Sequence, residues 1–160
     1  RSRGGRRRGD GMGGKRTVRL LLIEDNPGDA RLLMEIVREE RIPASMRVAG
    51  DGAEAIAILR SRGEERPDLI LLDLNLPRKN GREFLAEVKA DRRLKRIPVI
   101  VLTGSEAEEE IERAYDLHAN CYIVKPSTLD GFVDVVRGIA AFWLGVARIP
   151  RGGGEWGAGE

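Results

Sequence analysis

The stretch DLILLDLNLPRKNG, residues 68–81, decides the fold of this chain. Its first part, 68–72, places large aliphatic side chains in succession after a single aspartate. A short aliphatic run with polar residues at its ends is typical of a strand buried on both faces, as in the centre of a parallel sheet. Asp73 follows this run directly, and a segment with helical spacing, 82–89, comes after the polar loop. The stretch therefore predicts a buried strand, a loop that begins with a carboxylate, and a helix.

The same alternation of aliphatic runs and helical segments extends through the body of the chain. Three further runs, 18–23, 98–102 and 121–124, have the character of buried strands, and 46–49 is a weaker candidate because Arg47 interrupts it. Helical spacing marks the segments 30–40, 53–59, 82–89, 106–117 and 129–147. Strict alternation with short loops predicts an α/β fold with a parallel sheet and helices on both faces. Five strands in ~130 residues favour a flavodoxin-like (βα)5 doubly wound sheet with strand order 2-1-3-4-5.

The composition is that of one globular domain between two tails. Apolar residues make up 41% of the 160 residues and charged residues 34%, which suffices for an aliphatic core. We expect residues 1–16, with seven basic residues and one acidic, to be a disordered basic tail that is vector-derived or precedes the true start. The folded domain is expected over 17–149, followed by a disordered glycine-rich tail over 150–160.

The same features bear on where the chain works. Cys121 is the single cysteine, and the sequence shows no signal peptide and no apolar run approaching ~18 residues. These features favour a cytoplasmic protein that does not associate with a membrane.

Carboxylates follow two strands that the predicted order makes neighbours. Glu24 and Asp25 come directly after the first strand, and Asp73 comes directly after the third. The strand order reverses between these two strands, and ligands of such sheets bind at that point, beyond the carboxyl ends of the strands. Three crowded carboxylates repel one another unless a cation is present, and hard oxygen ligands favour Mg²⁺. Each pair alone would be an ordinary polar turn, but both together predict a magnesium site.

Two further strand ends bring a hydroxyl and a cation to the same edge. Thr103 ends the fourth strand and is followed by Gly104 and Ser105, while Lys125 follows the fifth. A hydroxyl donor and a lysine near a metal-bound anion suit phosphoryl transfer, where positioning and charge neutralisation do most of the catalysis. A carboxylate can serve as the covalent acceptor.

With these residues in place, 17–148 resembles the receiver domain of a two-component response regulator, with the chemotaxis regulator as the simplest relative. The resemblance implies that Asp73 is the phosphoacceptor, that Glu24 and Asp25 are the acidic pair that binds Mg²⁺, and that the backbone carbonyl of Asn75 is a further metal ligand. Thr103 matches the family's switch hydroxyl.

The resemblance extends to the fifth strand. Lys125 matches the family's active-site lysine, and Tyr122, three residues before it, matches the aromatic switch residue that acts with Thr103. Pro126 matches a cis proline. A sensor histidine kinase is the implied phosphodonor.

A narrower resemblance appears in four stretches. Residues 23–29, LDLNLPRKNGRE at 72–83, LHANCYIVKP at 117–126 and IAAFWL at 139–144 are similar to the single-domain regulators paired with bacterial and cyanobacterial phytochromes. This similarity implies a phytochrome, or bacteriophytochrome, as the cognate kinase.

Phosphorylation-controlled switching is the function that these residues favour. We expect no enzyme activity beyond the chain's own phosphorylation and dephosphorylation. An Asp-nucleophile phosphatase needs a carboxylate two residues after its nucleophile, where this chain has Asn75, and a nucleotide carrier would not place the acidic loop 25–29 against a phosphate. An intermediate receiver in a phosphorelay stays open as an alternative.

Output is expected to pass through another protein. Eleven residues follow Ile149, too few for a DNA-binding domain, so we expect a downstream protein partner or a histidine phosphotransfer protein.

The last predicted helix carries more apolar surface than packing on one sheet requires. At ~100° per residue its apolar arc spans roughly 200°, about twice the usual stripe. The surplus half predicts a homodimer. We assign the interface to one side of this arc: Phe132, Val135, Ile139, Phe142 and Val146.

Overall fold

The alternating segments form five strands and the helices between them. In the computed structural model, which describes residues 17–63 and 66–150, the order is β1(Val18–Ile23), α1(Pro27–Glu39), β2(Ala44–Ala49), α2(Gly52–Arg60), β3(Leu69–Leu72), α3(Gly81–Ala90), β4(Val99–Thr103), α4(Glu108–Asp116), β5(Cys121–Val124), α5(Leu129–Ile139) and a π-helix, η1(Ala140–Val146). The expected tails, 1–16 and most of 150–160, lie outside the described residues.

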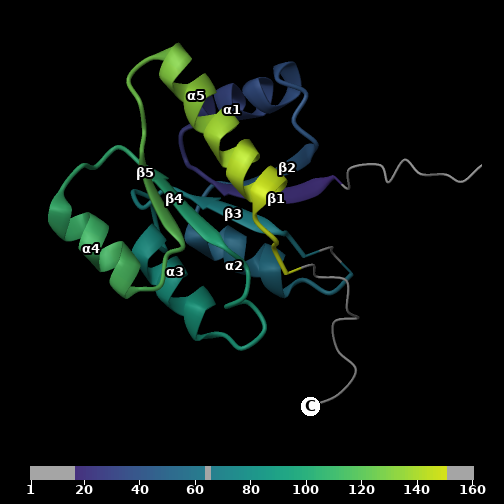
Figure 1. The fold of residues 1–160 in the computed structure, drawn as a ribbon. Coiled ribbons are helices and arrows are strands. Elements are labelled where there is room, and N and C mark those ends of the chain that lie inside the picture. The colour runs from purple at the N-terminus through teal and green to yellow at the C-terminus, as the bar shows by residue number, and fades with distance from the viewer. Residues whose placement is uncertain (1–16, 64–65, 151–160) are drawn as a thin grey trace, which may run out of the picture.

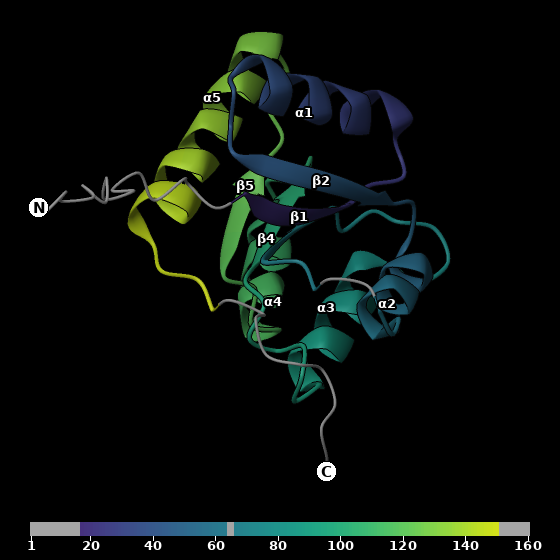
Figure 2. The same cartoon turned by 90° about the vertical axis from the view of Figure 1, so that its right-hand side faces the viewer.

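All neighbouring strands pair in parallel, in the order β2-β1-β3-β4-β5. The predicted doubly wound topology is therefore confirmed. Helices α1 and α5 cover one face of the sheet, and α2, α3 and α4 cover the other (Figures 1 and 2). Two apolar layers fill the space between the helices and the sheet, and the central strand β3 is buried along its whole length.

Helix starts at the carboxyl edge of the sheet are set by side-chain caps. The side chain of Asn26 accepts hydrogen bonds from the amides of Gly28 and Asp29, and Pro27 occupies the first turn, where its missing N–H costs nothing. Asp51, Asn80 and Thr128 cap α2, α3 and α5 in the same way. These caps fix how the chain leaves each strand, and so place the residues that follow the strands.

In the described part of the chain, no helix has the length and apolar character needed to cross a bilayer.

The end of the chain differs from the expected single helix over 129–147. After Ile139 the helix continues in π form, and the amide of Ala147 donates to the carbonyl of Phe142, five residues earlier. The wider turn changes the angular spacing of the side chains, so a uniform helical wheel misplaces those after Ile139.

Two of the residues expected at a dimer interface are instead part of the core. Phe132 and Ile139 are buried with Val136 against the sheet. The apolar arc of this helix is wide enough to pack on the sheet and also leave apolar residues at the surface. Helical spacing alone does not predict which half of the arc packs on the sheet. Val135 is half-buried, whereas the side chains of Phe142 and Val146 are exposed.

Candidate functional site

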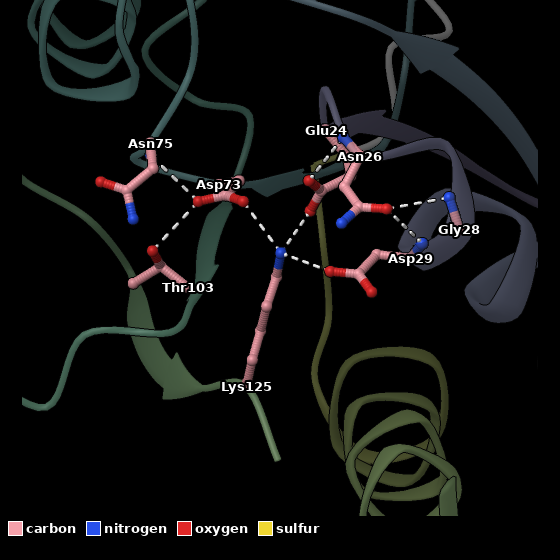
Figure 3. Close-up of polar contacts among 8 residues, drawn as sticks. All are labelled: Glu24, Asn26, Gly28, Asp29, Asp73, Asn75, Thr103 and Lys125. Carbon is pink, nitrogen blue, oxygen red and sulfur yellow. Dashed lines mark hydrogen bonds and ion pairs between the residues drawn. The ribbon is translucent and has the colours of Figure 1, made fainter. Parts of the chain in front are cut away.

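The side chain of Lys125 lies among three carboxylates at the carboxyl ends of the strands (Figure 3). Its Nζ is 2.6 Å from Glu24 Oε2, 2.9 Å from Asp73 Oδ2 and 2.9 Å from Asp29 Oδ2. Lys125 follows β5, Glu24 follows β1 and Asp73 follows β3, so the lysine joins the ends of three strands. Sequence reasoning expected Glu24, Asp73 and Lys125 here.

Asp29 was not expected at the site. It lies in the first turn of α1, three residues after the cap residue Asn26, whose own amide donates to Glu24 Oε1 at 3.1 Å. The signal that would have found it is helical geometry: capping at Asn26 turns the start of α1 back over the end of β1.

Burial and ion pairing act against each other on the two most enclosed charges. Burial raises the pKa of Glu24 to about 7, although hydrogen bonds from Lys125 and from the Asn26 amide oppose the shift, and repulsion from Asp73 adds to it. Burial also acts to lower the pKa of Lys125, but its hydrogen bonds to Glu24, Asp73 and Asp29 outweigh that effect and hold the pKa above its ordinary value. Lys125 thus stays cationic, whereas Glu24 takes up a proton near neutral pH.

The other oxygen of Asp73 is held from its own loop and from β4. Asp73 Oδ1 accepts hydrogen bonds from the Asn75 amide and from the Thr103 hydroxyl, each at 3.0 Å. Asp73 and Thr103 are both buried. Because Lys125 donates to Oδ2, hydrogen bonds orient both carboxylate oxygens of Asp73.

Glu24, Asp25 and Asp73 also form a group that fits a divalent metal ion. One carboxylate oxygen from each lies within 4.8 Å of the others, and among the described residues this is the cluster with that property. Asp25 is exposed, whereas Glu24 and Asp73 are buried, so the group opens to solvent on the Asp25 side. Hard carboxylate oxygens converging at such spacing suit a divalent cation that retains several waters.

Tyr122 fastens the loop that follows β4. Its hydroxyl donates to the Ser105 carbonyl at 2.8 Å, while its own amide donates to the hydroxyl of Tyr115 in α4 at 3.2 Å. Burial, together with repulsion from Glu110, raises the pKa of Tyr122, so its hydroxyl remains a donor at neutral pH. The two expected switch residues, Thr103 and Tyr122, therefore hold the two ends of the Thr103–Ser105 turn.

The expectation of a cis proline is wrong. The described residues contain no cis peptide bond, so Pro126 follows Lys125 through a trans bond. The trans isomer of an X–Pro bond is intrinsically favoured. The ring packs closely on Gly131, where an added Cβ would lie 2.6 Å from Pro126 Cβ, and this glycine makes room for it at the start of α5.

Comparison with known proteins agrees with this geometry. The response regulator receiver domain family matches residues 20–137. Response regulator Rcp1 of Synechocystis sp. is 45% identical over 135 residues, covering 82% of this chain and 92% of that protein.

Two solved structures extend the similarity. The phosphorylated cyanobacterial phytochrome response regulator RcpA is 49% identical with a TM-score of 0.79, covering 84% of this chain and 99% of that one. The Mn²⁺-bound form of response regulator Rcp1 is 44% identical with a TM-score of 0.77, covering 83% and 99%. From its strand order, its clustered carboxylates and these relatives, we conclude that the chain belongs to the response regulator receiver family.

Proposed function

We propose that this chain accepts a phosphoryl group on Asp73 from a phytochrome-type sensor histidine kinase, in a Mg²⁺-dependent reaction, and signals to a partner protein in the cytoplasm. The observation that carries the proposal is the environment of Asp73. This buried carboxylate contacts a cation on one oxygen, Lys125 Nζ, and a hydroxyl on the other, Thr103 Oγ1. The kinase assignment rests on the similarity to RcpA and Rcp1, the first of which is a phytochrome response regulator.

The chemistry is a single displacement at phosphorus. A carboxylate oxygen of Asp73 forms the new O–P bond as the N–P bond of a phosphohistidine breaks, and the imidazole keeps that electron pair and gains a proton from solvent. Lys125 and Thr103 already contact the two carboxylate oxygens, so they are placed to turn toward the oxygens of the arriving group. They neutralise the charge that these oxygens carry in the transition state.

The metal site belongs to the same reaction. Glu24, Asp25, Asp73 and the backbone carbonyl of Asn75 are the proposed ligands, with Asp25 direct and Glu24 acting through water. Bound Mg²⁺ would neutralise charge on the phosphoryl oxygens.

Signal output is assigned to the turn after β4. Phosphorylation would engage the Thr103 hydroxyl, and Tyr122 would respond through its bond to the Ser105 carbonyl. The altered surface is then read by a downstream protein or a histidine phosphotransfer protein.

A small phosphodonor tests this function. The protein incubated with acetyl phosphate and Mg²⁺ should gain the mass of one phosphoryl group, and brief treatment with base should remove it. Chelating the metal should prevent the gain. No mass change at saturating donor and Mg²⁺ would overturn the proposal.

The affinity for Mg²⁺ should depend on pH because of Glu24. Its pKa of about 7 means that the site holds a proton below this pH, and Mg²⁺ must displace that proton. The apparent affinity is therefore expected to fall by up to about tenfold per pH unit below 7 and to level off above it. Calorimetric titration with Mg²⁺ at pH 6, 7 and 8 measures this.

Two variants separate protonation from ligation. Glu24→Gln should bind Mg²⁺ with little dependence on pH in this range, whereas Asp25→Ala should bind more weakly at every pH while remaining folded, since Asp25 is exposed. An unchanged pH profile in Glu24→Gln would contradict the assignment.

We also propose a homodimer through α5, η1 and the neighbouring edge strand β5. Three apolar side chains on this last helical segment are exposed: Leu129 at 60%, Phe142 at 52% and Val146 at 75%. Phe142 and Val146 are four residues apart in η1, and neighbouring exposed apolar side chains often mark an interface. Light scattering at micromolar concentration should give a dimer mass, and Phe142→Asp should give a monomer.

The matched control for this prediction is Met34→Asp. Met34 is an exposed apolar residue of similar accessibility, 43%, on α1. Its variant should remain dimeric. A monomer mass for the unmodified protein would end the dimer proposal.

A further inference from the structure

Asp51 is a buried carboxylate that the reaction described above does not use. It lies two residues after β2, and only 3% of its surface is exposed. Its Oδ1 accepts from the Glu54 amide at 2.8 Å and so caps α2. Its Oδ2 pairs with Arg78 at 2.7 Å. The Glu54 amide and the Arg78 guanidinium hold the pKa of Asp51 below its usual value, so the carboxylate is charged.

Arg78 belongs to the loop that follows the acceptor, residues 74–80, which we call the acceptor loop. Its backbone has φ of 59°, a left-handed conformation that is uncommon for a residue with a side chain. Most of the Arg78 side chain, 79%, is exposed, yet its guanidinium reaches the buried carboxylate. A strained backbone at a residue whose tip makes such a contact indicates that the surrounding structure holds this residue in place.

The neighbouring residues make a second connection. The amide of Gly52 donates to the carbonyl of Lys79 at 3.1 Å. A Cβ on Gly52 would lie 2.5 Å from that carbonyl oxygen, so only glycine permits the approach. Asp51–Gly52 therefore contacts Arg78–Lys79 through one ion pair and one backbone hydrogen bond, an arrangement we call the loop clamp.

The other end of the acceptor loop is fixed at the site itself. The Asn75 amide donates to Asp73 Oδ1, and the Gly81 amide donates to the carbonyl of Leu74 at 3.1 Å. Only residues 74–77 separate Asp73 from the clamp. A displacement at Arg78 can therefore be transmitted to Asn75 through these few residues.

We propose that the loop clamp, and above all the Asp51–Arg78 ion pair, positions the acceptor loop so that Asn75 stays against Asp73 in the geometry needed for Mg²⁺ binding. Asp51 and Arg78 are positioning residues that act through Asn75. The inference rests on the proposed function, because it assigns a device to that same site.

Asp51→Asn is the sharpest test. Asparagine caps a helix about as well as aspartate, so the variant keeps the cap on α2 and removes only the charge. Mg²⁺ affinity measured by calorimetry should fall about tenfold, the lower end of the effect expected for residues that orient a metal site from behind. Phosphorylation by acetyl phosphate should need about tenfold more Mg²⁺ and should reach the same maximal rate. In the metal-free protein the Asn75 amide should exchange with solvent faster.

Arg78→Gly separates charge from backbone strain. Glycine adopts a positive φ freely, so this variant relaxes the backbone while removing the guanidinium. It should lose Mg²⁺ affinity by the same factor as Asp51→Asn. The double variant should be no weaker than either single variant, because both break one interaction. Arg78 is exposed, so this arm remains informative if Asp51→Asn fails to fold.

Arg137→Gln is the matched control. It breaks the two-bond ion pair between Arg137 of α5 and Glu40, the residue that follows α1, on the opposite face of the sheet. Its Mg²⁺ affinity and Asn75 exchange should equal those of the unmodified protein.

The outcomes keep the two proposals apart. Unchanged Mg²⁺ affinity in both Asp51→Asn and Arg78→Gly overturns the clamp, as do additive losses in the double variant. An unmodified protein that binds Mg²⁺ but takes no phosphate overturns the proposed function, while the affinity and exchange measurements still decide the clamp.

Discussion

Replacing Asp73 with asparagine is expected to abolish phosphate uptake. The amide is nearly the same shape as the carboxylate, and its oxygen can still accept from the Asn75 amide and the Thr103 hydroxyl. It is not a nucleophile toward phosphorus, so no base-labile phosphoryl group should form at any acetyl phosphate concentration. Intact-mass spectrometry after incubation with donor and Mg²⁺ makes the measurement.

The control lies at the other end of the same strand. Asp68 precedes β3 just as Asp73 follows it, and the Asp68 carboxylate accepts from the Arg19 amide at 2.9 Å. Asp68→Asn should take up phosphate at the normal rate. Phosphate on Asp73→Asn, mapped to any other residue, would show that a different carboxylate is the acceptor.

Removing the cation of Lys125 should damage both stability and reaction. Lys125→Met keeps most of the aliphatic stem and leaves Glu24 and Asp73, both buried, without their cation. Breaking a buried ion pair from one side typically costs about 3–5 kcal/mol of unfolding free energy. Mg²⁺ should restore part of this loss, because it supplies positive charge to the same carboxylates. Loss of one transition-state donor should slow phosphorylation by about 10²–10³.

Lys89→Met separates these two effects. Lys89 is also half-buried, but its Nζ donates to the carbonyls of Lys95 and Ile97 and to the side chain of Asn120, near the start of β4. Burial lowers the pKa of Lys89, and none of the contacts of its Nζ with the described residues is to a carboxylate. This variant should lose stability in urea or thermal unfolding and keep its phosphorylation rate. A normal rate in Lys125→Met would remove the lysine from the mechanism.

Much of the fold followed from the sequence because aliphatic runs leave few alternatives. The strand 18–23 and the strand 121–124 were predicted with the bounds that the structure shows. The weak candidate 46–49 is the end of a six-residue edge strand, Ala44–Ala49, in which half-buried and exposed residues alternate, so the strand carries less hydrophobic signal. The strand order then brought the carboxylates, the hydroxyl and the lysine to one edge.

The features that sequence reasoning missed depend on geometry that spacing does not encode. Asp29 reaches the site because of how the cap on α1 turns the chain, and Arg78 pairs with Asp51 from a left-handed backbone. The π-helical turn begins just after Gly138 and Ile139 within an apolar stretch, and the helical spacing of that stretch does not distinguish a π turn from an α turn. In each case tertiary packing determines the local backbone conformation.

The position of Lys125 also has a consequence for when the protein becomes competent during synthesis. Its partner Glu24 lies 101 residues earlier in the chain, and Asp73 lies 52 residues earlier. A chain emerging from the ribosome can pair β1, β2 and β3 long before β5 is made, but it then holds clustered carboxylates with no lysine among them. Contacts this distant in sequence form late, after the loops between them have closed. Phosphate acceptance should therefore require the chain to be synthesised past Lys125. A stalled or truncated chain that ends before Lys125 should accept little phosphate even where its first strands are folded.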